Sequence, residues 1–246
     1  MITVSGQEYT FEDLKPFVTG PHKVRVTREV KSSIKRSRRV LSHQIHSGKT
    51  IYGVNTGFGA LSQLHIDEKD QKQLQLNLVR SHSAGVGKSF EPGVTRAILF
   101  LKLINFCLGY SGVRWDVVAL LRDFINHDIL PVIPSKGSVG ASGDLAPLSH
   151  MTLAFIGEGE VLFNDRIISS SNAYKKTGLN PLTLKAKEGL ALLNGTQVST
   201  ALAVNGLIKM RNLLITADLV SAISVEATLS SRNVFNPILH RLKKHP

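Results

Sequence analysis

The stretch KGSVGASGDLAPLSH, residues 136–150, places three glycines within the seven residues 137–143, which also contain Ser138 and Ser142. Glycine enters left-handed and other strained backbone conformations at little steric cost. The glycines lead directly into the apolar run LAPLSHM, for which Asp144 is a candidate N-cap. One interpretation is therefore a loop whose glycines merely turn the chain into a capped helix.

A second interpretation gives Ala141, Ser142 and Gly143 a chemical role. Because Gly143 has no Cβ, its amide nitrogen can approach the carbonyl carbon of Ala141 and close a five-membered ring. Loss of one water from the ring, and of the Ser142 hydroxyl as a second, leaves an exocyclic methylene. This carbon is an electrophile, which no standard side chain provides. Small neighbours permit the strained turn, and nearby helix N-termini favour negative charge developing on the ring.

The composition is that of an ordinary globular protein, with 42% hydrophobic and 20% charged residues among 246. Cys107 is the single cysteine, so no internal disulfide can form, which favours a cytoplasmic setting. The N-terminus lacks the apolar core of a signal peptide. The longest uncharged stretch, Gly189 to Ile208, carries six polar side chains, which argues against a membrane span. We therefore expect a cytoplasmic protein without membrane contact.

The net charge of +12 is concentrated in residues 23–40 and in the C-terminal tail HRLKKHP. Residues 23–40 contain no aromatic side chain on which a nucleic-acid base could stack. No nucleic-acid-binding motif accompanies the patch. We therefore expect a solvated basic face, or one part of a protein whose remainder is acidic, rather than nucleic-acid binding.

Several runs resemble known binding motifs but lack a residue that the motif requires. The run AGVGKSF, residues 84–90, would need a glycine at position 82 to be a phosphate-binding loop, and that residue is His82. HSGKT, residues 46–50, fails in the same way at His43. The pair His43 and His46 has no further ligand beside it, and a surface pair is the better interpretation. We therefore expect neither a nucleotide nor a metal ion.

The hydrophobic periodicity predicts a mainly α chain, with a short strand and a helix within residues 1–20. Apolar runs around Asn164-Asp165 predict a β-hairpin. Further helices are expected over the ranges 27–47, 67–83, 91–112, 114–130 and 145–160.

The helical pattern from Leu184 to Ser231 contains no proline and is apolar on several faces. A single helix of about 45 residues would be roughly 68 Å long. A compact domain of this chain length is only ~46 Å across. Such a helix needs a kink, partner subunits or further polypeptide to cover it.

Four runs together resemble the aromatic amino acid ammonia-lyase family. GSVGASGDLAPL is similar to the family signature, whose Ala-Ser-Gly cyclises to methylidene-imidazolone. YGVNTGFG (52–59), QLNLVRSHSAGVG (75–87) and EGLALLNGTQ (188–197) resemble its catalytic tyrosine loop, its selectivity helix and its asparagine segment. The runs occur in the family's order and with similar spacing, so the resemblance covers essentially the whole chain.

The resemblance implies a mainly α fold of the ammonia-lyase and fumarase-like type, with minor β structure near the N-terminus. Residues 1–183 would form the N-terminal catalytic region that carries the cofactor loop. Residues 184–246 would form the first long helix of a central helical bundle, which is incomplete here. The cofactor implied is 4-methylidene-imidazol-5-one, without metal or nucleotide.

The resemblance implies roles for the residues of this chain that match the family's motifs. Ala141, Ser142 and Gly143 would form the cofactor, and Asp144 would assist ring formation or cap the next helix. Tyr52 would act as the base on a glycine-rich loop. Asn194 would hold the substrate or the ring oxygen, and its spacing to Gln197 and Asn205 suggests one polar helical face.

The pair Ser81-His82 bears on the substrate. Tyrosine lyases carry His-Leu at this place and phenylalanine lyases usually carry Phe-Leu, whereas Ser-His is similar to the histidine ammonia-lyases. His82 would contact the imidazole of the substrate. The resemblance therefore implies conversion of L-histidine to trans-urocanate and ammonia.

Members of the family are much longer chains. Their later half supplies a second tyrosine, an arginine, a phenylalanine and a glutamate, and active sites combine residues from several subunits of a homotetramer. We therefore expect little activity from these 246 residues alone. Two alternatives stay open: a truncated, non-catalytic homologue that acts as an interaction protein, and a related tyrosine or phenylalanine lyase or aminomutase.

Overall fold

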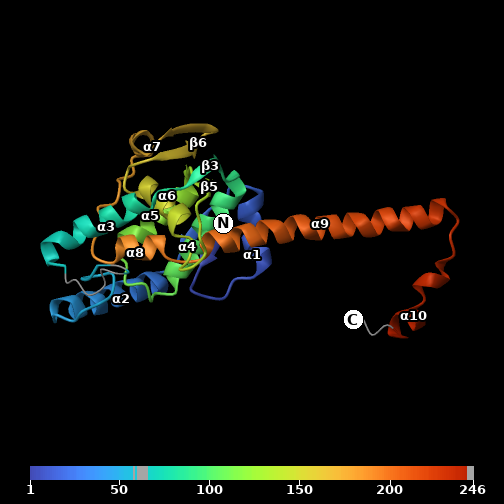
Figure 1. The fold of residues 1–246 in the computed structure, drawn as a ribbon, viewed down its shortest axis with the longest axis horizontal. Coiled ribbons are helices and arrows are strands. Elements are labelled where there is room, and N and C mark those ends of the chain that lie inside the picture. Colours follow the sequence, from blue (N-terminus) through green and yellow to red (C-terminus); the bar gives the residue numbers. More distant parts are fainter. Residues whose placement is uncertain (58, 60–65, 243–246) are drawn as a thin grey trace. The chain divides into compact units, whose positions relative to one another are not determined.

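The computed structural model describes residues 1–57, 59 and 66–242, and it divides into the units Met1–Asn205 and Gly206–Pro246. The first unit is mainly helical, as the sequence predicts (Figure 1). Its helices are α1 (Phe11–Thr19), α2 (Arg28–His46), α3 (Glu68–His82), α4 (Pro92–Cys107), α5 (Trp115–Asn126), α6 (Leu145–Phe155), α7 (Ser170–Thr177) and α8 (Glu188–Leu193), followed by the beginning of α9 (Gln197–Ala227).

Short strands accompany the helices. They are β1 (Ile2–Val4), β2 (Val24–Val26), β3 (Val86–Ser89), β4 (Leu130–Pro131), β5 (Pro134–Lys136), β6 (Glu160–Phe163) and β7 (Arg166–Ser169). β1 pairs with β2 in parallel, β3 pairs with β5 antiparallel, and β4, β6 and β7 form an antiparallel sheet. Asn164 and Asp165 both have positive φ between β6 and β7, the conformation of a tight hairpin turn, so the expected hairpin is confirmed.

Helix α4 forms the centre of the core. Its sequence is apolar on nearly all sides, which is the pattern of a buried helix. Leu99, Phe100 and Leu103 are fully buried, and α1, α2 and α5 pack around them. The helix begins with Pro92, whose missing N–H has no helical partner in any case, and ends at Cys107 just before Gly109, whose φ is +81°.

Two predicted helices extend too far. Helix α5 ends at Asn126 rather than at residue 130, because Asp128 has a positive φ that a helix does not allow, and Leu130 already belongs to β4. Helix α6 ends at Phe155, and the left-handed residues Gly157 and Gly159 turn the chain into β6.

The expectation of one continuous helix from Leu184 to Ser231 is wrong, because α8 ends at Leu193 and α9 begins at Gln197. Asn194 is extended, with φ −86° and ψ 132°, and Gly195 has φ +140°. Only glycine adopts such a positive φ readily. The interruption therefore depends on Gly195, and it takes Asn194 out of helical geometry.

The second unit contains the remainder of α9, a 3₁₀ turn (Arg232–Phe235) and α10 (Pro237–Leu242). Several of its large apolar side chains are exposed, including Leu213, Leu219 and Ile223, which are 64%, 61% and 67% exposed. Large apolar side chains exposed in such number indicate a surface made for contact. Within the described part of the chain, no helix is both long enough and apolar enough to cross a membrane.

Candidate active site

The tripeptide Ala141-Ser142-Gly143, which the sequence predicts to form the cofactor, lies on the loop that joins β5 to α6. Gly137, Gly140 and Gly143 all have positive φ, at +140°, +71° and +103°. Residues with a Cβ rarely adopt these conformations, which accounts for the three glycines. Ala141 and Ser142 are exposed, whereas Gly143 is half-buried. The loop therefore presents its small residues outward while its last glycine packs against the protein.

Gly143 packs against the interruption between α8 and α9. A Cβ added to Gly143 would lie 2.7 Å from the Gly195 carbonyl oxygen, 2.9 Å from the Gly195 nitrogen and 3.2 Å from Asn194 Oδ1. The two motifs are therefore in direct contact, and no side chain fits between them. The earlier interpretation that Asn194, Gln197 and Asn205 share one helical face is wrong, because Asn194 precedes α9 and is not helical.

Asp144 ties the loop to the beginning of α9. Its side chain is 1% exposed, and Oδ1 accepts hydrogen bonds from Ser138 Oγ at 2.9 Å and Ser199 Oγ at 2.6 Å. Oδ2 accepts from the Ser199 nitrogen at 2.8 Å, and the Asp144 nitrogen donates to the Gly195 oxygen at 2.7 Å. Asp144 occupies the N-cap position of α6, but its carboxylate caps no N–H of that helix. The expectation that its side chain caps α6 is therefore wrong.

Helices α3, α6 and α8 form the frame that brings the motifs together, because each packs against the other two. The buried amide of Gln75 bridges them: Nε2 donates to the Gly53 oxygen at 3.3 Å, and Oε1 accepts from the Leu190 nitrogen at 3.1 Å. The tyrosine loop and the asparagine segment are thus attached to one side chain of α3.

A second set of contacts joins the end of α3 to α6. Ser83 Oγ and Ser149 Oγ lie 2.9 Å apart, and the Gly85 nitrogen donates to His150 Nε2 at 3.0 Å. Burial lowers the pKa of His150, which favours the neutral ring that this acceptor role requires. A Cβ on Gly137 would lie 3.0 Å from Gly85 Cα, so the tripeptide loop itself rests on the segment after α3.

The loop that carries Tyr52 contacts the middle of α3, through Gly53 and Gln75, whereas His82 is the last residue of that helix. Tyr52 is 58% exposed, and its hydroxyl accepts a hydrogen bond from the Gly59 nitrogen at 3.3 Å. The loop turns at Gly53, with φ +67°, while Asn55 and Thr56 are buried. His82 is half-buried in the last turn of α3, and its Nδ1 lies 2.8 Å from the Leu78 oxygen and 3.1 Å from Ser81 Oγ. The loop residue Phe58 lies outside the described residues.

Sequence reasoning missed Lys102, Gln75 and Ser199. Lys102 Nζ donates to the Asn194 oxygen at 2.8 Å and to Gln197 Oε1 at 3.4 Å (α4, α8 and α9 in Figure 1). Burial lowers the pKa of this fully buried lysine to about 7. One signal was present in the sequence, since Lys102 interrupts the apolar run AILFLKLINFC.

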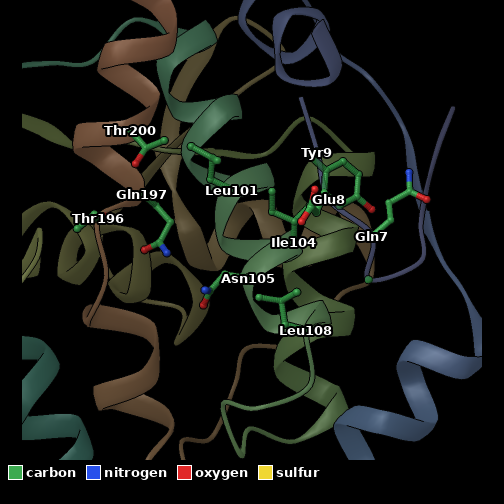
Figure 2. A pocket seen from close by; sticks show the side chains of 11 residues that line it. Gln7, Glu8, Tyr9, Leu101, Ile104, Asn105, Leu108, Thr196, Gln197 and Thr200 are labelled. Atoms are coloured by element: carbon green, nitrogen blue, oxygen red, sulfur yellow. The ribbon is translucent and has the colours of Figure 1, made fainter. Parts of the chain in front are cut away.

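A pocket of about 330 Å³ lies beside this region (Figure 2). Figure 2 shows Gln197 and Thr200 on one side, side chains of α4 in the middle, and Gln7, Glu8 and Tyr9 on the other. Its lining includes Gln197 but none of residues 141–143. The pocket is thus next to the asparagine segment and separate from the tripeptide. Among the described side chains, no three histidines, cysteines or carboxylates gather as metal ligands.

Comparisons with known proteins show similarity in sequence and in fold. A histidine ammonia-lyase of Vibrio cholerae is 43% identical over 244 residues, which are 99% of this chain and 48% of the relative. The structure is similar to that of histidine ammonia-lyase from Trypanosoma cruzi, with a TM-score of 0.91, 34% identity, and coverage of 99% of this chain and 48% of the other.

The structure is also similar to phenylalanine aminomutase of Pantoea agglomerans, with a TM-score of 0.94, 29% identity, and coverage of 100% of this chain and 48% of the other. The chain thus spans about half the length of the curated relatives it matches. The family model described as aromatic amino acid lyase matches residues 9–246. This chain belongs to the aromatic amino acid lyase family.

Proposed function

We propose that the protein carrying this chain is a histidine ammonia-lyase, which eliminates ammonia from L-histidine to give trans-urocanate. The observation that carries the proposal is the direct packing of Gly143 on the Asn194–Gly195 peptide. This contact joins the two motifs that the resemblance assigns to cofactor and substrate. Relatives at 43% identity over nearly the whole chain carry the same activity in their names.

The tripeptide fits the cofactor that the family uses. Cyclisation requires the Gly143 nitrogen to attack the Ala141 carbonyl carbon, with loss of one water from the ring and a second from Ser142. The positive φ of Gly143 and the absence of room for a Cβ there support a turn that only glycine allows. Formed from Ala141, Ser142 and Gly143, the methylidene-imidazolone would supply an electrophilic carbon for the amine or the ring of the substrate, a chemistry that no standard side chain provides.

The remaining roles belong to the chain's own side chains. Tyr52 removes the β-proton of the substrate, and its exposed position on a loop that turns at Gly53 suits a base that meets the substrate on closure. Asn194 holds the substrate or the ring oxygen, since its side-chain amide, which carries both a donor and an acceptor, lies beside Gly143. Asp144 fixes the tripeptide relative to α9.

His82 recognises the imidazole of the substrate through a hydrogen bond. Its Nδ1 faces the Leu78 carbonyl oxygen, so Nδ1 carries the hydrogen and donates it. Nε2 is then left as an acceptor. An acceptor at this place can take the N–H of a substrate imidazole, which phenylalanine does not have. Ser81 supports the orientation of His82 through its hydroxyl.

The complete enzyme requires more than this chain. We propose that residues 1–183 form the catalytic region and that residues 184–246 begin a helical bundle, in a cytoplasmic homotetramer. The exposed apolar side chains of the second unit support such an assembly. The tetramer supplies the carboxylate-binding and remaining substrate contacts, and no nucleic acid or membrane takes part.

A second candidate is a related aminomutase or lyase with another aromatic substrate, favoured by the similarity to the solved phenylalanine aminomutase. A third is a non-catalytic homologue that acts through its exposed helix. The full natural protein should release urocanate from L-histidine, with little product from L-phenylalanine or L-tyrosine, and its tripeptide should be two waters light. Products from L-phenylalanine or L-tyrosine would favour the second candidate. An uncyclised tripeptide without any product would favour the third.

A further inference from the structure

Lys102 is a buried cation in an otherwise apolar environment. Its side chain is 0% exposed, and it lies in α4 among the fully buried residues Leu99, Phe100 and Leu103. In the described part of the chain, no carboxylate lies within ion-pair distance of Nζ. Charged groups are rarely buried without such a partner, because they lose their hydration and nothing equivalent replaces it.

The partners of Nζ are neutral oxygens and a ring. The Asn194 carbonyl oxygen accepts at 2.8 Å and Gln197 Oε1 at 3.4 Å, and the Phe106 ring centroid is 5.2 Å away. A hydrophobic side chain would fill this site at lower cost. The lysine therefore does not serve core packing, and its one short contact is to the peptide that follows α8.

That peptide is the one on which Gly143 rests. The Asn194 carbonyl is held by Lys102, and the next carbonyl, of Gly195, accepts from the Asp144 nitrogen at 2.7 Å. The Gly195 nitrogen lies between these two anchors and is 2.9 Å from the point where a Gly143 Cβ would be. Lys102 thus fixes one side of the Asn194–Gly195 peptide, while the tripeptide segment fixes the other.

We propose that Lys102 is a positioning residue for cofactor formation, whose cation holds the Asn194–Gly195 peptide so that Gly143 is kept in the conformation needed to attack Ala141. This inference rests on the proposed function, because it needs the tripeptide to cyclise. A cation on the Asn194 oxygen also polarises that peptide, which strengthens the N–H of Gly195 as a donor beside Gly143.

The role of the charge on Lys102 can be tested by varying the pH, because the pKa of this lysine lies near neutrality. Burial alone lowers its pKa to about 7. Its facing groups, Asn194, Gln197 and Phe106, do not ionise, and no ionisable group of α1, α2, α5 or β4, which pack against α4, contributes to this lowering. The pKa of the neighbouring Cys107 is raised to about 12 and that of Tyr9 is also raised, so both stay neutral near pH 7.

The experiment compares the full natural chain with Lys102→Met, Lys102→Arg and the control Leu103→Met, which alters a neighbouring buried position of α4 without a polar contact. Each protein is first obtained as unfolded chain whose tripeptide has not cyclised. It is then refolded from denaturant. The loss of two waters from the peptide that carries residues 137–150 is then followed by mass spectrometry. Circular dichroism and thermal unfolding establish that each variant is folded.

We expect Lys102→Met to cyclise at least about tenfold more slowly, the kinetic equivalent of one charge-assisted hydrogen bond. Leu103→Met should cyclise at the natural rate. The natural protein should cyclise more slowly above pH 7 than below it. Lys102→Arg keeps its charge, so the ratio of its cyclisation rate to that of the natural protein should increase as the pH rises.

Two results would overturn the inference. One is a folded Lys102→Met that cyclises at the natural rate, and the other is an equal pH profile for the natural protein and Lys102→Arg. Should Lys102→Met fail to fold, the pH comparison with Lys102→Arg still decides the question. If the natural protein itself never loses the two waters, the proposed function fails first, and this inference falls with it.

Discussion

The carboxylate of Asp144 receives both the backbone N–H and the hydroxyl of Ser199, at 2.8 and 2.6 Å, although 55 residues separate the two in the chain. The first turn of α9 therefore holds the residue that follows the tripeptide. Buried carboxylates are stable when several donors satisfy them, and here Ser138 supplies a third. The geometry at Gly143 is thus defined by long-range contacts rather than by the loop alone.

Replacing Asp144 by asparagine keeps the size of the side chain but removes its charge and one acceptor oxygen. The Ser199 or Ser138 donors then lose a partner, and we expect a loss of about 1–3 kcal/mol of stability. Urea unfolding measures this loss, and the mass of the tripeptide measures the reduced yield of cofactor. Ser138→Ala removes only one donor and is the matched control. An Asp144→Asn protein as stable as the natural one would contradict the role given to this carboxylate.

Gly195→Ala tests the interruption between α8 and α9. The φ of +140° is unfavourable for alanine, and its Cβ would lie 2.3 Å from Gln197 Oε1. Strain of this kind costs about 1–3 kcal/mol. Gly206→Ala is the control, since Gly206 lies within α9 with no atom within 4 Å of an added Cβ. That change should stabilise the helix by about 0.5–1 kcal/mol, so opposite shifts in the thermal midpoint are expected.

The buried Lys102 also gives stability a defined pH dependence. The folded pKa of about 7 lies below the reference value of 10.5, so the unfolded chain binds more protons between these limits. The free energy of unfolding should therefore rise with pH from about 7, by at most about 1.4 kcal/mol per pH unit. Lys102→Met lacks this contribution, and Cys107 is present in both proteins. The difference between their unfolding free energies at pH 7 and pH 9 measures it, and a constant difference would contradict the lowered pKa.

The pair Ser81-His82 should decide the substrate. Exchanging it for His-Leu, the pair that tyrosine lyases carry, removes the acceptor Nε2 of His82 from its place. We expect kcat/KM for L-histidine to fall by about tenfold or more, as for loss of one hydrogen bond to a polar substrate, while that for L-tyrosine rises. Ser81→Ala alone, which keeps His82, is the control. An unchanged preference for L-histidine would mean that other residues read the imidazole.

Local patterns in the sequence were enough to predict several elements. The helix expected over residues 67–83 is α3, with Asp67 at its N-cap position, and Asn164-Asp165 forms the hairpin turn. The tripeptide was found because three glycines around a serine are locally conspicuous. The interruption at Asn194 has a local signal in Gly195, which the continuous helical pattern around it masked. The contact of Lys102 with the Asn194 carbonyl spans 92 residues and has no such signal. Gln75 and Leu190 are similarly 115 residues apart. Such contacts have no periodicity, so only the folded structure reveals them.

If cyclisation depends on the contact between Gly143 and the Asn194–Gly195 peptide, it records that a molecule has folded. The contact exists only after α4, α6 and α8 have assembled, since Lys102 and Asp144 hold it from different segments. Cyclisation that depends on it is covalent, and it persists when the chain is later denatured. The mass of a denatured molecule would then report whether that molecule had ever reached its native fold, as a permanent mark of successful folding.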